Sequence, residues 1–285
     1  MYKRQVEIDV SFSGTITKVQ TQQPQLVADG TVDIAIIVPG LSPDRFYDNT
    51  VIELPGLFRD PHEASYVFTR LIETGALKGY EDFFVIGALV SDGEIIHSRK
   101  PIASVADLAG LKIRANNRSE AATLGQLGAI PVLLAINQTT DAITQGNIDG
   151  ATLPPAMLYE FGLGRITSHH YLLQLGGAPT ALVMNRAKFE SLPPPAQAII
   201  RKYSGEWLAE RSAAGFDVLN SQVLAQLKSD RRRQVVGLSS SDADAAQRAF
   251  SEVIGEWASS SRHNRELLAQ AEAEIAKFRS AKVVQ

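Results

Sequence analysis

Histidine side chains are the first candidates for chemistry in this sequence, because imidazole can act as a general base and as a metal ligand. The chain has five histidines and no cysteine. His169 and His170 are adjacent, so on a strand they would point to opposite faces and could not bind the same metal ion. No H-E-x-x-H spacing occurs. The sequence therefore predicts no metal site and no cofactor.

Motifs for nucleophilic catalysis and for phosphate binding are also missing from the sequence. There is no G-x-S-x-G segment, which would place a nucleophilic serine on a sharp turn. Neither glycine-rich phosphate loop, G-x-G-x-x-G or G-x-x-x-x-G-K-[ST], occurs. A serine, histidine and aspartate brought together only by the fold would still be compatible with the composition. We therefore expect a protein that is not an enzyme, with an enzyme as the alternative.

Arg114 is the cation with the most specific expected role. It alternates with Ile113 and Ala115 at the end of an apolar strand pattern, so it lies on the opposite face from them. Ligands of open α/β sheets bind outside the carboxyl ends of the strands. A guanidinium at such a position can hold a carboxylate with two parallel hydrogen bonds. Arg114 is thus a candidate carboxylate anchor, and the competing interpretation is a surface or structural ion pair.

Composition limits the classes of function further. The 285 residues are enough for about two domains of roughly 150 residues each. The net charge of −3 and the isoelectric point near 6.0 argue against nucleic-acid binding, which normally needs a basic face. Apolar runs such as residues 34–38 are too short to span a bilayer.

The elements that must position Arg114 alternate between strands and helices over the first two-thirds of the chain. This order predicts an α/β fold with largely parallel sheets. Strands are predicted at 6–12, 31–38, 82–90, 111–115, 131–134, 170–175 and 180–184. Helices are predicted at 61–76, 119–127, from the N-cap Asn137 to 145, and at 154–161. The last third is predicted to be helical at 195–228, 242–260 and 262–279, with a short strand within 231–238.

Several ordered blocks resemble the TRAP-transporter solute-binding proteins of the DctP type. Residues 105–114, VADLAGLKIR, resemble the segment DLKGLKIR of that family. Residues 128–132, GAIPV, resemble its LGATPV, and residues 142–150, AITQGNIDG, resemble its ALQTGVVDG. The segments VMNR at 183–186 and SLPP at 191–194 resemble its VMNKKAWDSLPP, and 27–35 and 54–58 also fit. The resemblance covers nearly the whole chain.

The resemblance implies a two-lobe periplasmic-binding-protein fold with crossing strands and a long connecting helix. The first lobe would comprise 1–91 plus 180–219, and the second 92–179 plus 220–270. The helix end at 271–285 would pack across both lobes.

The start of the chain departs from the family pattern. Mature chains of the family begin with a strand and a helix before the strand that matches 6–12, and both are missing here. Residues 1–5, MYKRQ, also match the translated end of a sequencing adapter. We therefore expect a truncated N-terminus, with 6–12 and 31–38 in one sheet but not paired to each other.

The resemblance also implies which residues bind the ligand. The carboxylate-binding arginine of the family falls on Arg114, and the polar residue shortly after it falls on Asn116. A pocket aromatic falls on Ile136, and a ligand-contacting asparagine falls on Leu153. A second arginine, found in some sialic-acid and dicarboxylate binders, falls near Gly93 and Glu94 and is absent.

These departures keep the carboxylate anchor but change the rest of the pocket. Two positions that are aromatic or polar in the family are aliphatic here, which favours an organic acid with an apolar or aromatic body. Contacts from the facing lobe are expected from the turn formed by Val38, Pro39 and Gly40.

The function implied is that of the periplasmic substrate-binding component of a TRAP transporter. It would capture an organic acid between its lobes for uptake driven by an ion gradient, and deliver it to the TRAP membrane subunits. The protein is expected to be a monomer in the periplasm, without nucleic-acid binding or membrane insertion, although the sequence shows no signal-peptide pattern. The alternatives are an enzyme on the same fold and a binding protein that feeds a sensor.

Overall fold

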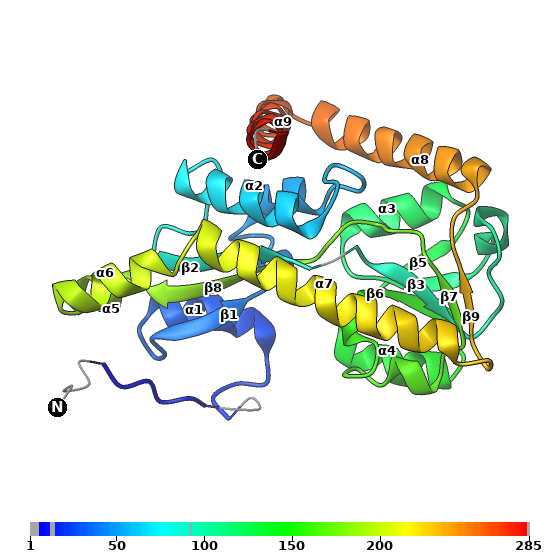
Figure 1. Cartoon of the computed structure of the whole chain (residues 1–285), viewed down its shortest axis with the longest axis horizontal. Coiled ribbons are helices and arrows are strands. Elements are labelled where there is room, and N and C mark those ends of the chain that lie inside the picture. Colours follow the sequence, from blue (N-terminus) through cyan, green and yellow to red (C-terminus); the bar gives the residue numbers. More distant parts are fainter. Residues whose placement is uncertain (1–5, 12–14, 92, 284–285) are drawn as a thin grey trace.

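The strands of the protein form two separate sheets, which lie side by side with helices packed around them (Figure 1). The structure is a computed structural model that describes residues 6–11, 15–91 and 93–283. The predicted mixed α/β class is confirmed, and each sheet has its own buried apolar core.

The smaller sheet has three strands in the order β1–β8–β2. These strands are β1 (Ile34–Ile37), β2 (Phe83–Val90) and β8 (Pro179–Asn185). Helix α2 (Pro61–Glu73) covers the sheet by packing on β2. It begins at Asp60, whose side chain accepts a hydrogen bond from the Glu63 N–H at 2.8 Å, and proline fills the first helical position.

The larger sheet has six strands in the order β5–β4–β6–β3–β7–β9. They are β3 (Ile95–Ser98), β4 (Lys112–Ala115), β5 (Ile130–Leu133), β6 (Gly150–Leu153), β7 (His169–Tyr171) and β9 (Gln234–Val236). Strand β4 is parallel to both β5 and β6, and β7 is parallel to β9.

The expectation of largely parallel sheets was wrong. Strand β8 is antiparallel to β1 and β2, and β3 is antiparallel to β6 and β7. The physical reason lies in the chain path. The chain enters β3 and β8 directly from the segments that cross between the sheets. Each of these strands therefore starts at the junction of the sheets and runs in the opposite direction to its neighbours.

Two crossing segments join the sheets and pair with each other. The N–H of Ser91 donates to Ala178 O at 3.1 Å, and that of Glu94 donates to Gly176 O at 2.7 Å. Leu175 N–H returns a bond to Glu94 O at 3.0 Å. Position 177 must be glycine because a Cβ atom there would collide with the carbonyl oxygen of Ser91.

The helices hold the two sheets together. They are α1 (Gln23–Ala28), α3 (Arg118–Gln126), α4 (Ile136–Thr144), α5 (Arg186–Ser191), α6 (Pro194–Lys202), α7 (Glu206–Ser229), α8 (Ser240–Ser259) and α9 (Arg262–Val283). The 24-residue α7 runs along both sheets, contacting α2 and β2 at one end and β9 at the other (Figure 1). Helix α8 packs on α3, and α9 packs on α2.

Element boundaries differ from the sequence predictions in several places. Helix α4 begins at Ile136 with Ala135 as its N-cap, so Asn137 lies inside the first turn. The helix predicted at 154–161 is reduced to the 3-10 turn Pro155–Met157. The helix predicted at 195–228 is split between α6 and α7 at Gly205, whose φ of +64° is not helical.

The predicted strand at 6–12 is wrong for residues 6–11, which form no strand, and residue 12 lies outside the described residues. Val6, Ile8 and Val10 alternate as expected but are all exposed. Alternation stabilises a strand only where a neighbouring strand pairs with it, and β8 is the only partner of β1 among the described strands. Residues 6–11 do not pair with β1, as expected. They also belong to no sheet, so the expectation that they share a sheet with β1 was wrong.

Candidate ligand-binding site

Arg114 lies at the carboxyl end of β4, where the sequence pattern predicted it. In the parallel ladders on either side, Arg114 stands opposite Val132 of β5 and Ala151 of β6. Ile113 and Ala115 belong to an apolar cluster that contains neither of these partners. Because the three strands run in parallel, the backbone that follows each of them meets at one edge, around Arg114.

The guanidinium of Arg114 is held by three oxygen atoms from this edge. Its Nε donates to Leu134 O at 2.9 Å, its Nη1 to Thr152 O at 3.0 Å, and its Nη2 to Asn116 Oδ1 at 2.8 Å. The residue is only 3% exposed. A guanidinium has five N–H bonds. The three contacts fix its orientation and leave two N–H bonds for another acceptor.

The structure brings the other predicted residues of the larger sheet to the same edge. Asn116 contacts Arg114 directly, and Leu153 follows Thr152 at the end of β6. The side chain of Leu153 is buried in an apolar cluster, and Ile136, at the start of α4, packs against that cluster. Contact of these side chains with a ligand stays a prediction.

The predicted turn of the facing lobe, at Val38, Pro39 and Gly40, lies beside a buried carboxyl group. The 3-10 turn Pro39–Leu41 contacts the 3-10 helix Tyr47–Glu53. A Cβ atom on Gly40 would lie 2.5 Å from Oε1 of Glu53, so any side chain at position 40 would displace this carboxyl group. The helix Tyr47–Glu53 also contacts α3 of the larger sheet, which places the turn and Glu53 near the junction of the lobes.

Sequence reasoning missed three buried carboxyl groups at this site, on Glu53, Glu94 and Glu120. Glu94 lies on a crossing segment, and its Oε2 is 3.9 Å from Nη1 of Arg114. Glu120 lies in the first turn of α3, and its Oε2 accepts hydrogen bonds from the Asn116 N–H and the Thr152 hydroxyl, both at 2.8 Å. Their exposed fractions are 7%, 2% and 1%, respectively.

Burial favours the uncharged form of all three carboxyl groups. It raises the pKa of Glu53 to about 8, with a further contribution from the nearby Glu120. Burial and Glu120 also raise the pKa of Glu94 well above its usual range, against the opposing effect of Arg114. Burial raises the pKa of Glu120 as well, against the hydrogen bond from Asn116. Burial thus opposes a negative charge on the acidic groups nearest to Arg114.

Only part of this carboxyl cluster left a signal in the sequence. Glu53 interrupts the apolar run VIELPGLF, and Glu94 precedes a strand that is entirely buried. Both contexts indicate a buried acid. Glu120 gives no such signal, because an acid in the first turn of a helix is ordinary, and Asn117 caps this helix by accepting from the Glu120 N–H at 2.9 Å.

A buried pair of histidines was also missed, and it supports the end of β6. The Nδ1 atoms of His97 and His170 are 2.7 Å apart, and Nε2 of His97 is 3.1 Å from Leu153 O. A carbonyl oxygen can only accept, so His97 carries its proton on Nε2 and accepts at Nδ1 from His170. Nε2 of His170 then accepts from Nη1 of Arg233 at 3.4 Å. Burial lowers the pKa of His97 to about 4 and that of His170 to about 3, so both are neutral at pH 7.

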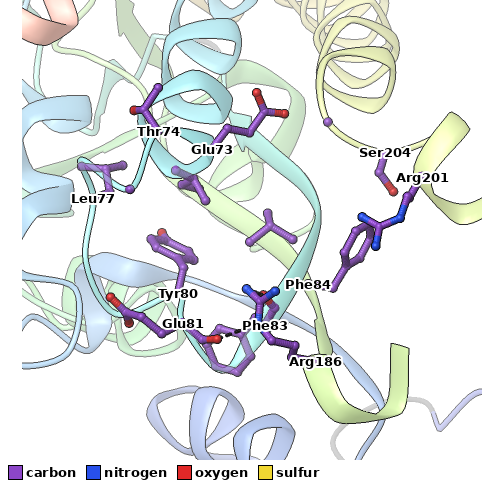
Figure 2. Close-up of a pocket in the computed structure, with 14 residues that line it drawn as sticks. Glu73, Thr74, Leu77, Tyr80, Glu81, Phe83, Phe84, Arg186, Arg201 and Ser204 are labelled. Atoms are coloured by element: carbon purple, nitrogen blue, oxygen red, sulfur yellow. Dashed lines mark hydrogen bonds between the residues drawn. The ribbon is translucent and has the colours of Figure 1, made fainter. Parts of the chain in front are cut away.

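An open cavity of about 600 Å³ lies elsewhere, beside the smaller sheet. Figure 2 shows its labelled residues, among them Tyr80, Phe84, Arg186 and Arg201, around an opening next to α2 and β2. Nε of Arg186 donates to Glu81 O at 2.7 Å. None of its lining residues belongs to the larger sheet, so this cavity is separate from the Arg114 site.

Two further observations concern metals and membranes. Over residues 6–11, 15–91 and 93–283, no three histidine or acidic side chains gather as they would around a metal ion. Among the described helices, none combines the length and apolar character needed to cross a bilayer.

Solved structures of TRAP solute-binding proteins are similar to this chain. One is a marine metagenome protein specific for aromatic acid ligands, in complex with metahydroxyphenylacetate. The TM-score is 0.85 at 26% identity, over 92% of this chain and 85% of that one. Another, from Rhodoferax ferrireducens, was solved with copurified benzoate. Its TM-score is 0.83 at 29% identity, over 95% of this chain and 86% of that one.

Curated relatives match over a shorter span. The C4-dicarboxylate-binding periplasmic protein DctP of Rhodobacter capsulatus is 25% identical over 181 residues, which are 61% of this chain and 54% of that protein. The chain thus spans little more than half the length of such relatives. The family model described as bacterial extracellular solute-binding protein, family 7, matches residues 1–260. The predicted resemblance is therefore confirmed, and the chain belongs to family 7 of the bacterial extracellular solute-binding proteins.

Proposed function

We propose that this protein is the substrate-binding component of a TRAP transporter and that it captures an organic acid through Arg114. One observation carries this proposal. The buried guanidinium of Arg114 is held by three oxygen atoms of its own lobe, has two N–H bonds left, and has Glu94, whose pKa is raised, as its acidic neighbour. A buried cation with spare donors is a suitable anchor for a ligand carboxylate.

The proposed mechanism is closure of two lobes on the ligand, without catalysis. The lobes would comprise 1–91 plus 180–219 and 92–179 plus 220–270, with 271–285 packing across them. The second lobe would supply Arg114 and Asn116, and the first would supply the turn at Gly40. Because only the closed state lets both lobes contact the ligand, binding shifts the equilibrium towards closure. Exclusion of water then strengthens the interaction between Arg114 and the carboxylate.

The ligand is proposed to have an apolar or aromatic body. Ile136 and Leu153 offer aliphatic side chains at positions where the family resemblance implies aromatic or polar ones. Two similar structures, at 26% and 29% identity, were solved with metahydroxyphenylacetate and benzoate. The protein would act as a monomer in the periplasm and deliver the acid to TRAP membrane subunits.

The test is a thermal-shift screen with benzoate, phenylacetate, mandelate, 4-methylpentanoate, succinate and glucuronate. A ligand present at 100 times its Kd adds about 2.7 kcal/mol to the free energy of unfolding. We expect the aromatic and branched monocarboxylates to raise Tm more than succinate or glucuronate. Benzamide and phenylacetamide are the matched controls, since they keep the shape without the charge. Equal shifts with the amides, or no shift with any acid, would contradict the proposal.

A further inference from the structure

Glu53 is a buried acid at the junction of the proposed lobes. Its exposed fraction is 7%. Its helix, Tyr47–Glu53, contacts α3 of the larger sheet, and its Oε1 atom lies 2.5 Å from where a Cβ atom on Gly40 would be. Burial raises its pKa to about 8, Glu120 on α3 adds to this increase, and no described cation opposes it. The ionised form of Glu53 is therefore costly in this environment.

Among the described residues, the other elements packed around this helix supply no positive charge to Glu53. Burial raises the pKa of the neighbouring Tyr80 well above its usual range, so its hydroxyl group is neutral. Asp48, on the same helix as Glu53, lies 2.6 Å from Nε2 of His263 on α9, so this histidine faces Asp48. The Pro39–Leu41 turn and strand β8 also contact the helix, and neither contains a titratable side chain. A proton is therefore the remaining means of neutralising Glu53.

Across the junction, Arg114 lies beside a pair of acids, Glu94 and Glu120. Its Nη1 atom is 3.9 Å from Oε2 of Glu94. The two carboxyl groups interact, and they can hydrogen-bond to each other once one of them is protonated. Arg118, in the first turn of α3, is exposed. A carboxylate held by Arg114 uses the charge of that side chain, so an ionised Glu53 would lie near the bound acid without a positive charge of its own.

We propose that Glu53 takes up a proton from the solvent when the protein captures an organic acid, so that the acid and a proton bind together. This inference rests on the function proposed above. The proton forms an O–H bond with the Glu53 carboxylate, and no covalent bond of the acid changes. Capture places the negative charge of the acid between the lobes, and closure excludes water and brings Glu53 towards Glu120. Both changes oppose a negative charge on Glu53, because charges repel more strongly where water is excluded.

This coupling makes the affinity for the acid fall as the pH rises. With a pKa of about 8, Glu53 is mostly protonated at pH 7 and mostly ionised at pH 9. If the complex needs the protonated form, Kd at pH 9 is about tenfold higher than at pH 7. The carboxyl group of the acid, with a pKa of about 4, stays ionised over this range, and guanidinium groups stay charged.

The experiment is calorimetric titration with benzoate, replaced by phenylacetate if benzoate does not bind. Titrations at pH 8 in phosphate and in Tris, which differ in ionisation enthalpy, count the protons exchanged, and we expect an uptake of about 0.5–1 proton for each acid bound. Titrations at pH 7 and pH 9 should show the tenfold rise in Kd. In Glu53→Gln, which keeps a neutral polar side chain, the uptake should vanish and Kd should change less than threefold. Glu252→Gln, at an exposed position on α8, is the matched control and should behave like the parent.

The failure of this inference differs from the failure of the proposed function. If the acid binds the parent without proton uptake and with the same Kd at pH 7 and pH 9, the proton coupling is overturned and the proposed function stands. If Glu53→Gln takes up as many protons as the parent, another group binds the proton and the assignment to Glu53 is overturned. If no acid of the thermal-shift screen binds the folded protein, the proposed function and this inference fail together.

Discussion

The carboxyl group of Glu94 faces the guanidinium of Arg114 at 3.9 Å without a hydrogen bond between them. The family resemblance places a second arginine near this position in sialic-acid and dicarboxylate binders. This chain has Glu94 near that position instead, and its carboxyl group is buried. That difference is the basis for expecting a monocarboxylate ligand.

Glu53 should make the stability of the protein decrease as the pH rises. Its pKa is raised to about 8 in the folded protein, so folding takes up a proton between pH 5 and 8, where the unfolded side chain is ionised. The free energy of unfolding should therefore fall with pH in this window. Glu53→Gln removes the effect, and its stability relative to the parent should rise by roughly 1.4 kcal/mol for each pH unit.

The measurement is urea unfolding of the parent and Glu53→Gln at pH 5, 6, 7 and 8. Glu252→Gln, at an exposed position on α8, is the matched control and should differ from the parent by a constant amount. A constant difference for Glu53→Gln as well would show that Glu53 is not protonated in the folded protein.

His97 and His170 should titrate separately from His62. Burial lowers the pKa of His97 to about 4 and that of His170 to about 3. Partial burial lowers the pKa of His62, but its bonds to Glu210 and Asp217 outweigh this and raise it overall. Since the unfolded chain binds protons below about pH 6.5, His97 and His170 should each lower stability as the pH falls from there towards 4.

The check is a nitrogen-15 NMR titration of the imidazole rings. At pH 5 we expect His97 to be neutral with its proton on Nε2, His170 to be neutral with its proton on Nδ1, and His62 to be charged. A common midpoint for the three rings would contradict the hydrogen-bond chain from Arg233 to the carbonyl group of Leu153.

The crossing segments should not tolerate a side chain at position 177. In Gly177→Ala the new Cβ atom would meet the carbonyl oxygen of Ser91, which the ladder between the two segments holds in place. We expect a loss of about 1–3 kcal/mol in the free energy of unfolding. Gly255→Ala on α8 has open space around it and should gain up to about 1 kcal/mol from helix propensity. Equal stability of both variants would be the contrary result.

Local sequence patterns predicted the position of Arg114 well. The alternation at 111–115 placed Arg114 at the end of a strand, and β4 spans Lys112–Ala115. The alternation of apolar and polar residues is a local property of the sequence, so it can be recognised without knowledge of the fold. The direction of β3 and β8 was predicted wrongly, because it depends on where the chain crosses between sheets.

The acidic part of the site was not predicted, for a related physical reason. Glu53, Glu94 and Glu120 come from three distant segments, and their burial and raised pKa values arise only when the fold brings these segments near one another. The histidine pair is similar, since His97 and His170 meet only across the ladder between β3 and β7. The strand predicted at 6–12 failed at 6–11, where none of the described strands pairs with the chain.

The most direct test of the carboxylate anchor is calorimetric titration of Arg114→Ala, with the acid that binds most tightly in the thermal-shift screen. Removing one partner of a buried charge pair costs about 2–5 kcal/mol, which corresponds to a loss of roughly 30-fold to several thousand-fold in affinity. Arg114→Lys should recover only part of the affinity, because an ammonium group cannot donate two parallel hydrogen bonds. Arg118→Ala, at an exposed position on α3, should bind like the parent. If folded Arg114→Ala binds within threefold of the parent, the carboxylate anchor lies elsewhere.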